Sequence, residues 1–156
     1  MVLNPAGHMV WDVWHEIPVK FPTVLPDAFT VMPNHIHGVL WLTEPERTGG
    51  DAPNDRTDEA LPKAHSPSLP EIIQWFKSLT TARYRHGVVE QGWPPFPGKL
   101  WQRSYYDHIV RRDEALNRIR QYIRDNPQRW SMDRYNPESV GPDPWAIEIW
   151  HMLQAP

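Results

Sequence analysis

Apolar residues near the start of the chain recur at helical spacing. Between positions 10 and 17 they fall three or four residues apart. Asn4 followed by Pro5 is a typical helix start, because asparagine caps free N–H groups and proline suits the first turn. The pattern predicts a helix over about 5–17 that ends at Pro18.

Two extended apolar stretches follow this helix. Residues 27–32 and 36–43 are rich in β-branched and aromatic residues and are separated by Pro33–Asn34. Neighbouring strands with so short a break favour an antiparallel pair. We therefore expect a hairpin here.

The second half of the chain predicts two more helices and a strand. Ser68 and Glu71 have the spacing of a capping box, which starts a helix that we expect to run to about Arg85 and close at Gly87. Residues 105–110 have the composition of a strand. Asp113 is then expected to cap a helix that ends before Pro127.

The order of these elements favours an α+β fold. Helices alternate with strands of an antiparallel sheet, so we expect the helices to pack on that sheet. The interval 44–67 is polar and rich in Pro, Gly and Asp, which predicts a flexible acidic loop; His65 within it is expected to face solvent. The final apolar segment, 145–153, is expected to dock on the body.

Composition narrows the chemistry. With 156 residues the chain fits one domain, and without cysteine it can form neither disulfides nor a thiolate site. It has no apolar run of membrane-spanning length and no signal segment at its start. We expect a cytoplasmic protein without a membrane partner.

The net charge of −3 conceals an uneven distribution. Residues 71–135 contain 12 Lys/Arg against 7 Asp/Glu, whereas the rest of the chain is strongly acidic. Local basic surface governs phosphate binding more than overall charge does. An arginine-rich helix surface in contact with water explains the same numbers.

His35 and His37 are the first candidates for chemistry. Side chains alternate between the faces of a strand, so the two imidazoles should project to the same side. Two neutral imidazoles at that spacing can bind one divalent ion. Incidental histidines on a strand face are commoner, so this pair alone is a weak signal.

Tyr122 and Asn126 form a second pair, four residues apart on one face of the helix predicted over 113–126. Both should sit at the edge of its apolar stripe, facing the margin of the sheet. A packing tyrosine and a helix-end asparagine are the ordinary interpretations. Combined with the histidines, however, an asparagine oxygen could be a third ligand and the phenol a nucleophile.

The chain resembles the single-tyrosine DNA transposases that have a His-hydrophobic-His motif, known as the HUH motif. These are the insertion-sequence-200-like and REP-associated tyrosine transposases. The resemblance rests on four blocks: VMPNHIHGVLWL, LPEIIQWFKSLTTARY, LWQRSYYDHIVRR and LNRIRQYIRDNPQRW. It covers a domain over 1–133 and leaves 134–156 as a proline-rich C-terminal tail.

The resemblance implies a function and a site. His35, His37 and Asn126 would bind magnesium or manganese, and Tyr122 would be the nucleophile. The substrate would be single-stranded or hairpin DNA, cut to a 5′-phosphotyrosine and later rejoined. Family members occur as monomers and as dimers, so a homodimer is one expectation.

The resemblance also assigns a role to the basic segment. Eight basic residues become candidates for phosphate contacts: Lys77, Arg83, Arg85, Arg103, Arg111, Arg112, Arg118 and Arg124. Four aromatic residues are candidates for stacking on bases: Trp75, Trp101, Tyr105 and Tyr106.

One feature departs from the family. Its members usually have a β-strand before the first helix, in the middle of a ferredoxin-like sheet and beside the His-x-His strand. This chain opens at the helix, so we expect the sheet to lack that strand. A late start codon, a decayed gene copy and a strand supplied by another chain or segment all fit the sequence.

Three functions therefore compete. The first is a single-strand DNA transposase that uses Tyr122. The second is a catalytically decayed or domesticated protein that binds DNA hairpins without cutting them. The third is a metal-dependent hydrolase that uses His35 and His37 without covalent catalysis.

Overall fold

The computed structural model describes residues 2–44 and 66–154. They form a two-stranded antiparallel sheet with helices packed against it, which confirms the α+β class. Most of the loop predicted over 44–67, including His65, lies outside the described residues.

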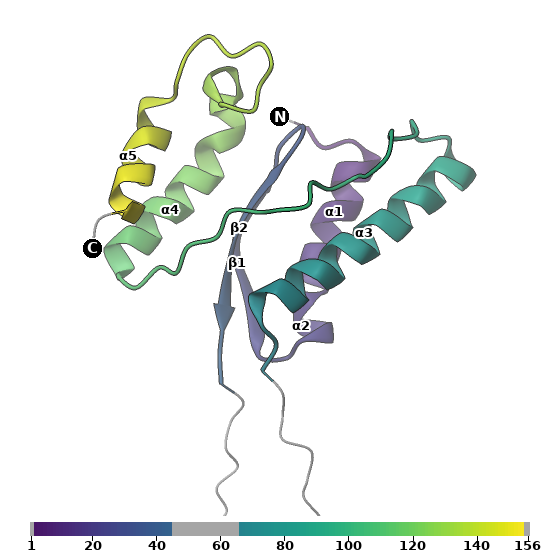
Figure 1. Cartoon of the computed structure of the whole chain (residues 1–156), viewed down its shortest axis with the longest axis horizontal. Helices are drawn as coiled ribbons and strands as arrows, with labels where there is room; N and C mark the ends of the chain where they lie inside the picture. The colour runs from purple at the N-terminus through teal and green to yellow at the C-terminus, as the bar shows by residue number, and fades with distance from the viewer. Residues whose placement is uncertain (1, 45–65, 155–156) are drawn as a thin grey trace, which may run out of the picture.

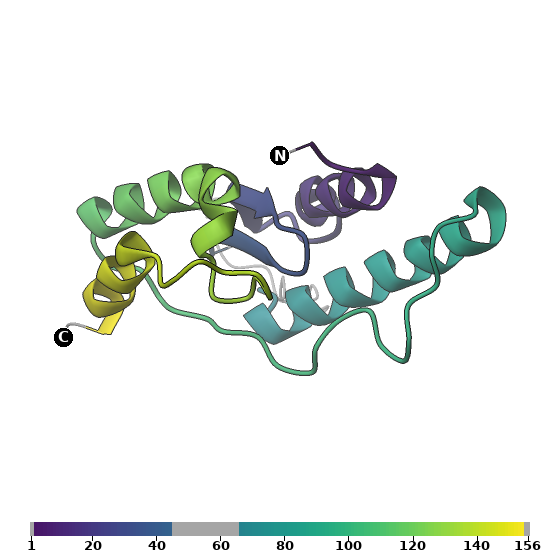
Figure 2. The same ribbon diagram turned by 90° about the horizontal axis from the view of Figure 1, so that it is seen from above.

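The hairpin stands between two groups of helices (Figure 1). Strands β1 (Val24–Val31) and β2 (Ile36–Leu42) form the hairpin, and α1 (Pro5–His15) and α3 (Leu69–Gln91) lie to one side of it. On the other side are α4 (Asp113–Asp125) and α5 (Pro144–Gln154), and Figure 2 shows the same arrangement from above. Within the described ranges, no helix is both long and apolar enough to cross a membrane.

The first helix begins as predicted and ends earlier. The Gly7 N–H donates to Asn4 Oδ1 at 2.8 Å, which is the expected cap. The helix stops at His15, and Pro18 lies within the following short helix α2 (Ile17–Lys20) instead of ending the run. Proline is tolerated there because N–H groups in a first helical turn have no intrahelical acceptor.

A bulge in β1 determines which side chains face which helices. Pro26 pairs with Leu40 and Phe29 with Gly38, so β1 contains one residue more than β2 over this interval. The extra residue shifts the alternation, and Val24 and Phe29, five positions apart, both enter the core under α1 and α3. Ala28 consequently packs in the second core, beneath α4 and α5.

The bulge also provides an anchor for α4. Asp27 accepts hydrogen bonds from Arg120 of α4, with Nη2 at 2.5 Å and Nε at 3.0 and 3.1 Å from its carboxylate oxygens. Trp41 Nε1 and the Ala28 N–H donate to the same carboxylate, each at 2.7 Å. One acidic side chain thus joins both strands to α4.

The third helix is longer than predicted. The capping box is present, with the Ser68 N–H donating to Glu71 at 2.7 Å. The helix continues through Gly87, where the absence of a side chain leaves room for the Trp93 ring to pack against the helix. It ends instead at Gly92, which adopts a left-handed conformation (φ 67°).

The prediction of a strand over residues 105–110 is wrong. In the described part of the chain the sheet has two strands, and this segment runs between α3 and α4 without a ladder. A strand is defined by hydrogen bonds to a neighbour, and its composition alone cannot supply one. Tyr105, Tyr106 and Ile109 are accordingly exposed.

The C-terminal elements cover the second face of the sheet. Leu116, Ile119 and Ile123 are buried, as the apolar stripe predicted. Helix α4 begins at Asp113, which is its first residue and not its cap, and a 3₁₀ helix, η1 (Asn126–Met132), extends it beyond Pro127. The segment predicted to dock forms α5 and packs on α4 through Ile149.

Gly38, between His37 and Val39, is packed tightly against the first core. A Cβ atom added there would lie 2.5 Å from Cη2 of Trp14, and that indole is stacked on Phe29 with ring centroids 4.3 Å apart. We predict that Gly38→Ala lowers the free energy of unfolding by about 1–3 kcal/mol, because the rigid indole must move. Urea unfolding followed by circular dichroism measures this loss.

A double variant identifies the cause of that loss. Trp14→Phe removes the ring atoms that the new Cβ would meet, so the combined loss should be smaller than the sum of the two single losses. Strictly additive losses would show that Trp14 is not what excludes a side chain from position 38.

The Asp27–Arg120 pair predicts a specific acid sensitivity. Hydrogen bonds from Arg120 lower the pKa of Asp27 from 3.8 to about 2. A folded-state pKa below the unfolded one means that the unfolded chain binds the extra proton first. The pair's contribution is therefore complete above about pH 4 and is lost as pH falls towards 2.

We therefore expect Asp27→Asn to be less stable than the native chain at pH 7 and to approach it at acid pH. Chemical unfolding of both proteins between pH 7 and pH 2 measures the difference. If the difference in unfolding free energy between the two proteins stays constant across this range, the assignment of the low pKa to Asp27 is contradicted.

Candidate functional site

The two histidines project to the same side of the hairpin, towards α4. Ile36 between them packs in the first core, so the alternation of strand side chains sends both imidazoles to the opposite face. Their Nε2 atoms are 3.0 Å apart and their ring centroids 4.7 Å apart. The prediction that the pair shares one face is confirmed.

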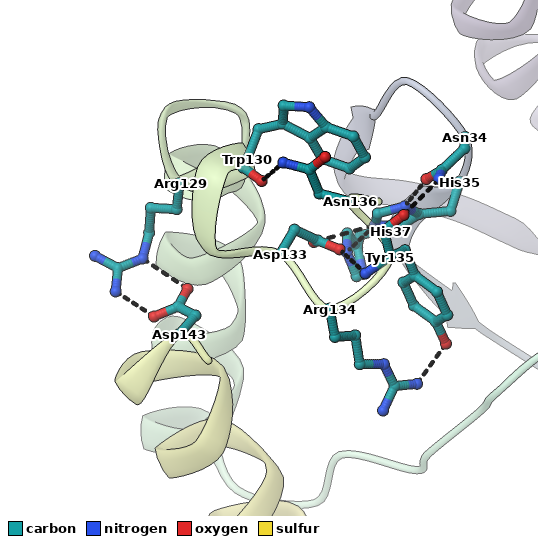
Figure 3. Close-up of polar contacts among 10 residues, drawn as sticks. All are labelled: Asn34, His35, His37, Arg129, Trp130, Asp133, Arg134, Tyr135, Asn136 and Asp143. Carbon is teal, nitrogen blue, oxygen red and sulfur yellow. Dashed lines mark hydrogen bonds and ion pairs between the residues drawn. The ribbon is translucent and has the colours of Figure 1, made fainter. Parts of the chain in front are cut away.

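Asn34 orients the His35 ring. Its Nδ2 donates to the Tyr135 carbonyl oxygen at 2.7 Å, so its Oδ1 is left to accept from His35 Nδ1 at 2.8 Å. The proton of a neutral His35 then lies on Nδ1, and its Nε2 carries the lone pair, which accepts from His37 Nε2 at 3.0 Å. Figure 3 shows this bend meeting the segment that follows η1.

Asp133 brings a carboxylate to the histidines. It is 7% exposed, and its Oδ2 lies 3.5 Å from His35 Nε2. One ligand atom from each of His35, His37 and Asp133 can be chosen so that all lie within 4.8 Å of one another. The group is therefore compact enough to surround a single cation.

The local electrostatics favour neutral histidines. Burial lowers the pKa of both imidazoles; at His35 the Asp133 carboxylate opposes this effect, and at His37 the neighbouring His35 adds to it. Neutral imidazole is the form that binds metal. Imidazole suits transition ions and carboxylate suits magnesium and manganese, so manganese fits the whole donor set.

Tyr122 of α4 lies against the histidine pair. Its ring centroid is 5.7 Å from that of His37 and 6.0 Å from that of Trp145. Burial raises the pKa of its hydroxyl, while the Asn126 side chain lowers it in part. The phenol is thus protonated at neutral pH in this environment.

Asn126 is buried at the end of α4. It is 1% exposed, and among the described residues its Nδ2 has no hydrogen-bond partner. The side chain is close enough to the Tyr122 hydroxyl to alter its pKa. The structure therefore associates Asn126 with the tyrosine that precedes it by one helical turn.

Four of the eight basic candidates are held by other protein groups. Arg83 makes two hydrogen bonds to Glu16, and Lys77 donates to the Gln102 carbonyl oxygen. Arg118 pairs with Glu148, and Arg124 donates to Gln121. Arg111 and Arg112 are exposed just before α4.

Three of the candidates line one cleft. It has a volume of about 810 Å³ and lies between α3 and residues 96–105. Its basic residues are Lys77, Arg85, Lys99 and Arg103, and none of the described residues that line it is acidic. Phe96, Trp101 and Tyr105 contribute aromatic surface.

The aromatic candidates divide between packing and exposure. Trp75 packs edge-on against Phe21, and Trp101 donates to Thr80 Oγ1 at 2.8 Å. Tyr105 and Tyr106 are 41% and 57% exposed, although Tyr106 also lies against Trp150. Of these four, the two tyrosines are exposed and the two tryptophans are half-buried.

Asp133 is the site residue that sequence reasoning missed. It lies beyond the helical pattern, in a stretch with no periodicity, and no spacing rule connects it with His35. The one available signal was an acidic residue seven positions after Asn126. Only the turn that follows η1 brings it to the histidines.

The fold and site define an α+β protein with a His-His-Asp cluster next to a buried tyrosine. The chain is 34% identical over 137 residues to an uncharacterized protein of Haemophilus influenzae, and the match covers 86% of this chain and 71% of that protein. The chain belongs to the same family as that protein. No family model and no solved structure matches it.

Proposed function

We propose that this protein cleaves and rejoins single-stranded DNA through Tyr122, in the manner of a single-tyrosine transposase. The observation behind the proposal is the juxtaposition of Tyr122 with His37, at 5.7 Å between ring centroids, beside a cluster that can hold a cation. A nucleophile next to such a cluster is the minimal arrangement for metal-assisted phosphoryl transfer.

His35, His37 and an oxygen ligand would hold the ion. When bound, a divalent ion supplies Lewis-acid polarisation of the scissile phosphate. The chain's own residues do the rest: the bulge and Arg120 fix α4, and α4 presents the phenol from one side of the histidines. Trp145 also contacts the Tyr122 ring, edge-on with centroids 6.0 Å apart, and limits its movement.

The covalent step balances without a cofactor. The Tyr122 oxygen attacks phosphorus, a new O–P bond forms, and the bond from phosphorus to the 3′ oxygen breaks. The phenol loses one proton and the departing 3′ oxygen gains one, so no net proton is consumed. Attack of a 3′ hydroxyl on the phosphotyrosine reverses these changes and rejoins the strand.

The charge distribution supports a nucleic-acid substrate. A cleft whose described lining includes four basic residues and no acidic one attracts phosphates, and exposed tyrosines can stack on unpaired bases. Arg111 and Arg112 add exposed positive charge at the start of α4. The net negative charge of the chain does not oppose this, because its basic residues are concentrated in one segment.

A covalent-adduct assay tests the proposal. The protein is incubated with end-labelled single-stranded hairpin DNA and manganese, and the products are separated on a denaturing protein gel. We expect a labelled adduct that Tyr122→Phe reduces to below roughly 1% of the native level, because no other group replaces a lost nucleophile.

Tyr135 provides the matched comparison. Its ring centroid lies 5.0 Å from that of His35, so it is the other tyrosine next to the histidine pair. Tyr135→Phe should retain the adduct, and loss in that variant alone would reassign the nucleophile. DNA that is bound and never cut would indicate a binding protein, and cleavage that survives Tyr122→Phe would indicate a hydrolase.

A further inference from the structure

The Asp133 carboxylate is held in position by its own turn. The Tyr135 N–H donates to Oδ1 at 2.7 Å, which leaves Oδ2 directed at His35 Nε2. The Asp133 N–H donates to the Trp130 carbonyl oxygen, and the Asn136 N–H to the Asp133 carbonyl oxygen. Both oxygens and the backbone of this residue are therefore oriented before any ion binds.

The same turn is attached to the histidine strand. The Tyr135 carbonyl oxygen accepts from Asn34, and Asn34 in turn accepts from His35 Nδ1. Residues 101 positions apart in the sequence are joined by the first of these bonds. This turn thus places the Asp133 carboxylate next to His35 Nε2 and, through Asn34, also orients the His35 ring (Figure 3).

We propose that Asp133 is the third protein ligand of the ion held by His35 and His37, and that Asn126 positions Tyr122 instead of binding metal. This inference rests on the proposed function for the presence of an ion. A carboxylate offers a charged oxygen to a hard divalent ion, whereas an amide offers a neutral one. Asp133 is also the residue whose oxygen lies 3.5 Å from a ligand nitrogen.

The position of Asn126 fits the second half of the proposal. Its side chain is buried at the base of Tyr122 and alters the pKa of that phenol. Its Nδ2 has no other hydrogen-bond partner among the described residues, so it is available to donate to the phenol oxygen and to hold the nucleophile in one rotamer. Asn126 is therefore a positioning residue, and its effect should appear in cleavage and not in metal affinity.

Binding of manganese alone tests the assignment without any DNA. The free-ion signal in electron paramagnetic resonance gives the Kd for the native chain, Asp133→Asn and Asn126→Leu. The amide oxygen introduced by D133N can still accept from the Tyr135 N–H, so this variant keeps the turn and removes only the charge. We expect D133N to weaken binding by at least about tenfold and N126L to bind like the native chain.

Thermal unfolding of each apo variant shows whether it is folded, and Asp133→Ser is a second variant should D133N be unstable. Unchanged affinity in D133N, or a tenfold loss in N126L, would overturn the assignment while leaving tyrosine cleavage intact. An absence of manganese binding in the native chain would overturn it too. Manganese binding through Asp133 without a DNA adduct would instead refute the proposed function alone.

Discussion

The ion pair between Asp27 and Arg120 sets the geometry on which the site depends. Asp27 lies in the bulge of β1, and Arg120 is two residues before Tyr122 in α4. The apolar contacts between α4 and the sheet do not by themselves set the rotation of the helix, because apolar contacts are not directional. The bidentate geometry of arginine and carboxylate fixes both distance and direction. The position of the phenol against His37 follows from it.

Packing on the opposite face of the hairpin also helps to orient the site. Gly38 lies so close to the Trp14 ring that a side chain at this position would clash with it. Because residues on either side of a strand position face the other way, packing Gly38 inward turns His37 towards α4. The glycine that follows the histidine motif is thus explained by packing, independently of any metal.

Local signals in the sequence predicted much of this fold. The Asn4 cap, the capping box at Ser68 and the apolar stripe of α4 depend on residues a few positions apart, and each is present. The shared face of His35 and His37 follows from strand alternation alone. Errors arose where distant groups mattered. Gly87 lies inside α3, with the Trp93 ring packed on it, and in the described part of the chain residues 105–110 have no neighbouring strand with which to pair. The bulge at Asp27 and the arrival of Asp133 were likewise invisible to local patterns.

The residues of the described site come from three kinds of structural element. His37 belongs to a strand of the sheet, Tyr122 to a helix anchored by an ion pair, and Asp133 to an irregular turn. Contacts on both sides of this turn along the chain support it as well. Arg129, before the turn, pairs with Asp143, after it. Asp143 also caps α5 by accepting from the Trp145 N–H. Trp145 in turn contacts Tyr122. The C-terminal segment therefore supports both the carboxylate and the phenol, and loosening it would disturb both groups together. The sequence predicted a proline-rich tail over 134–156 whose residues 145–153 dock on the body, but it did not predict this support of the site.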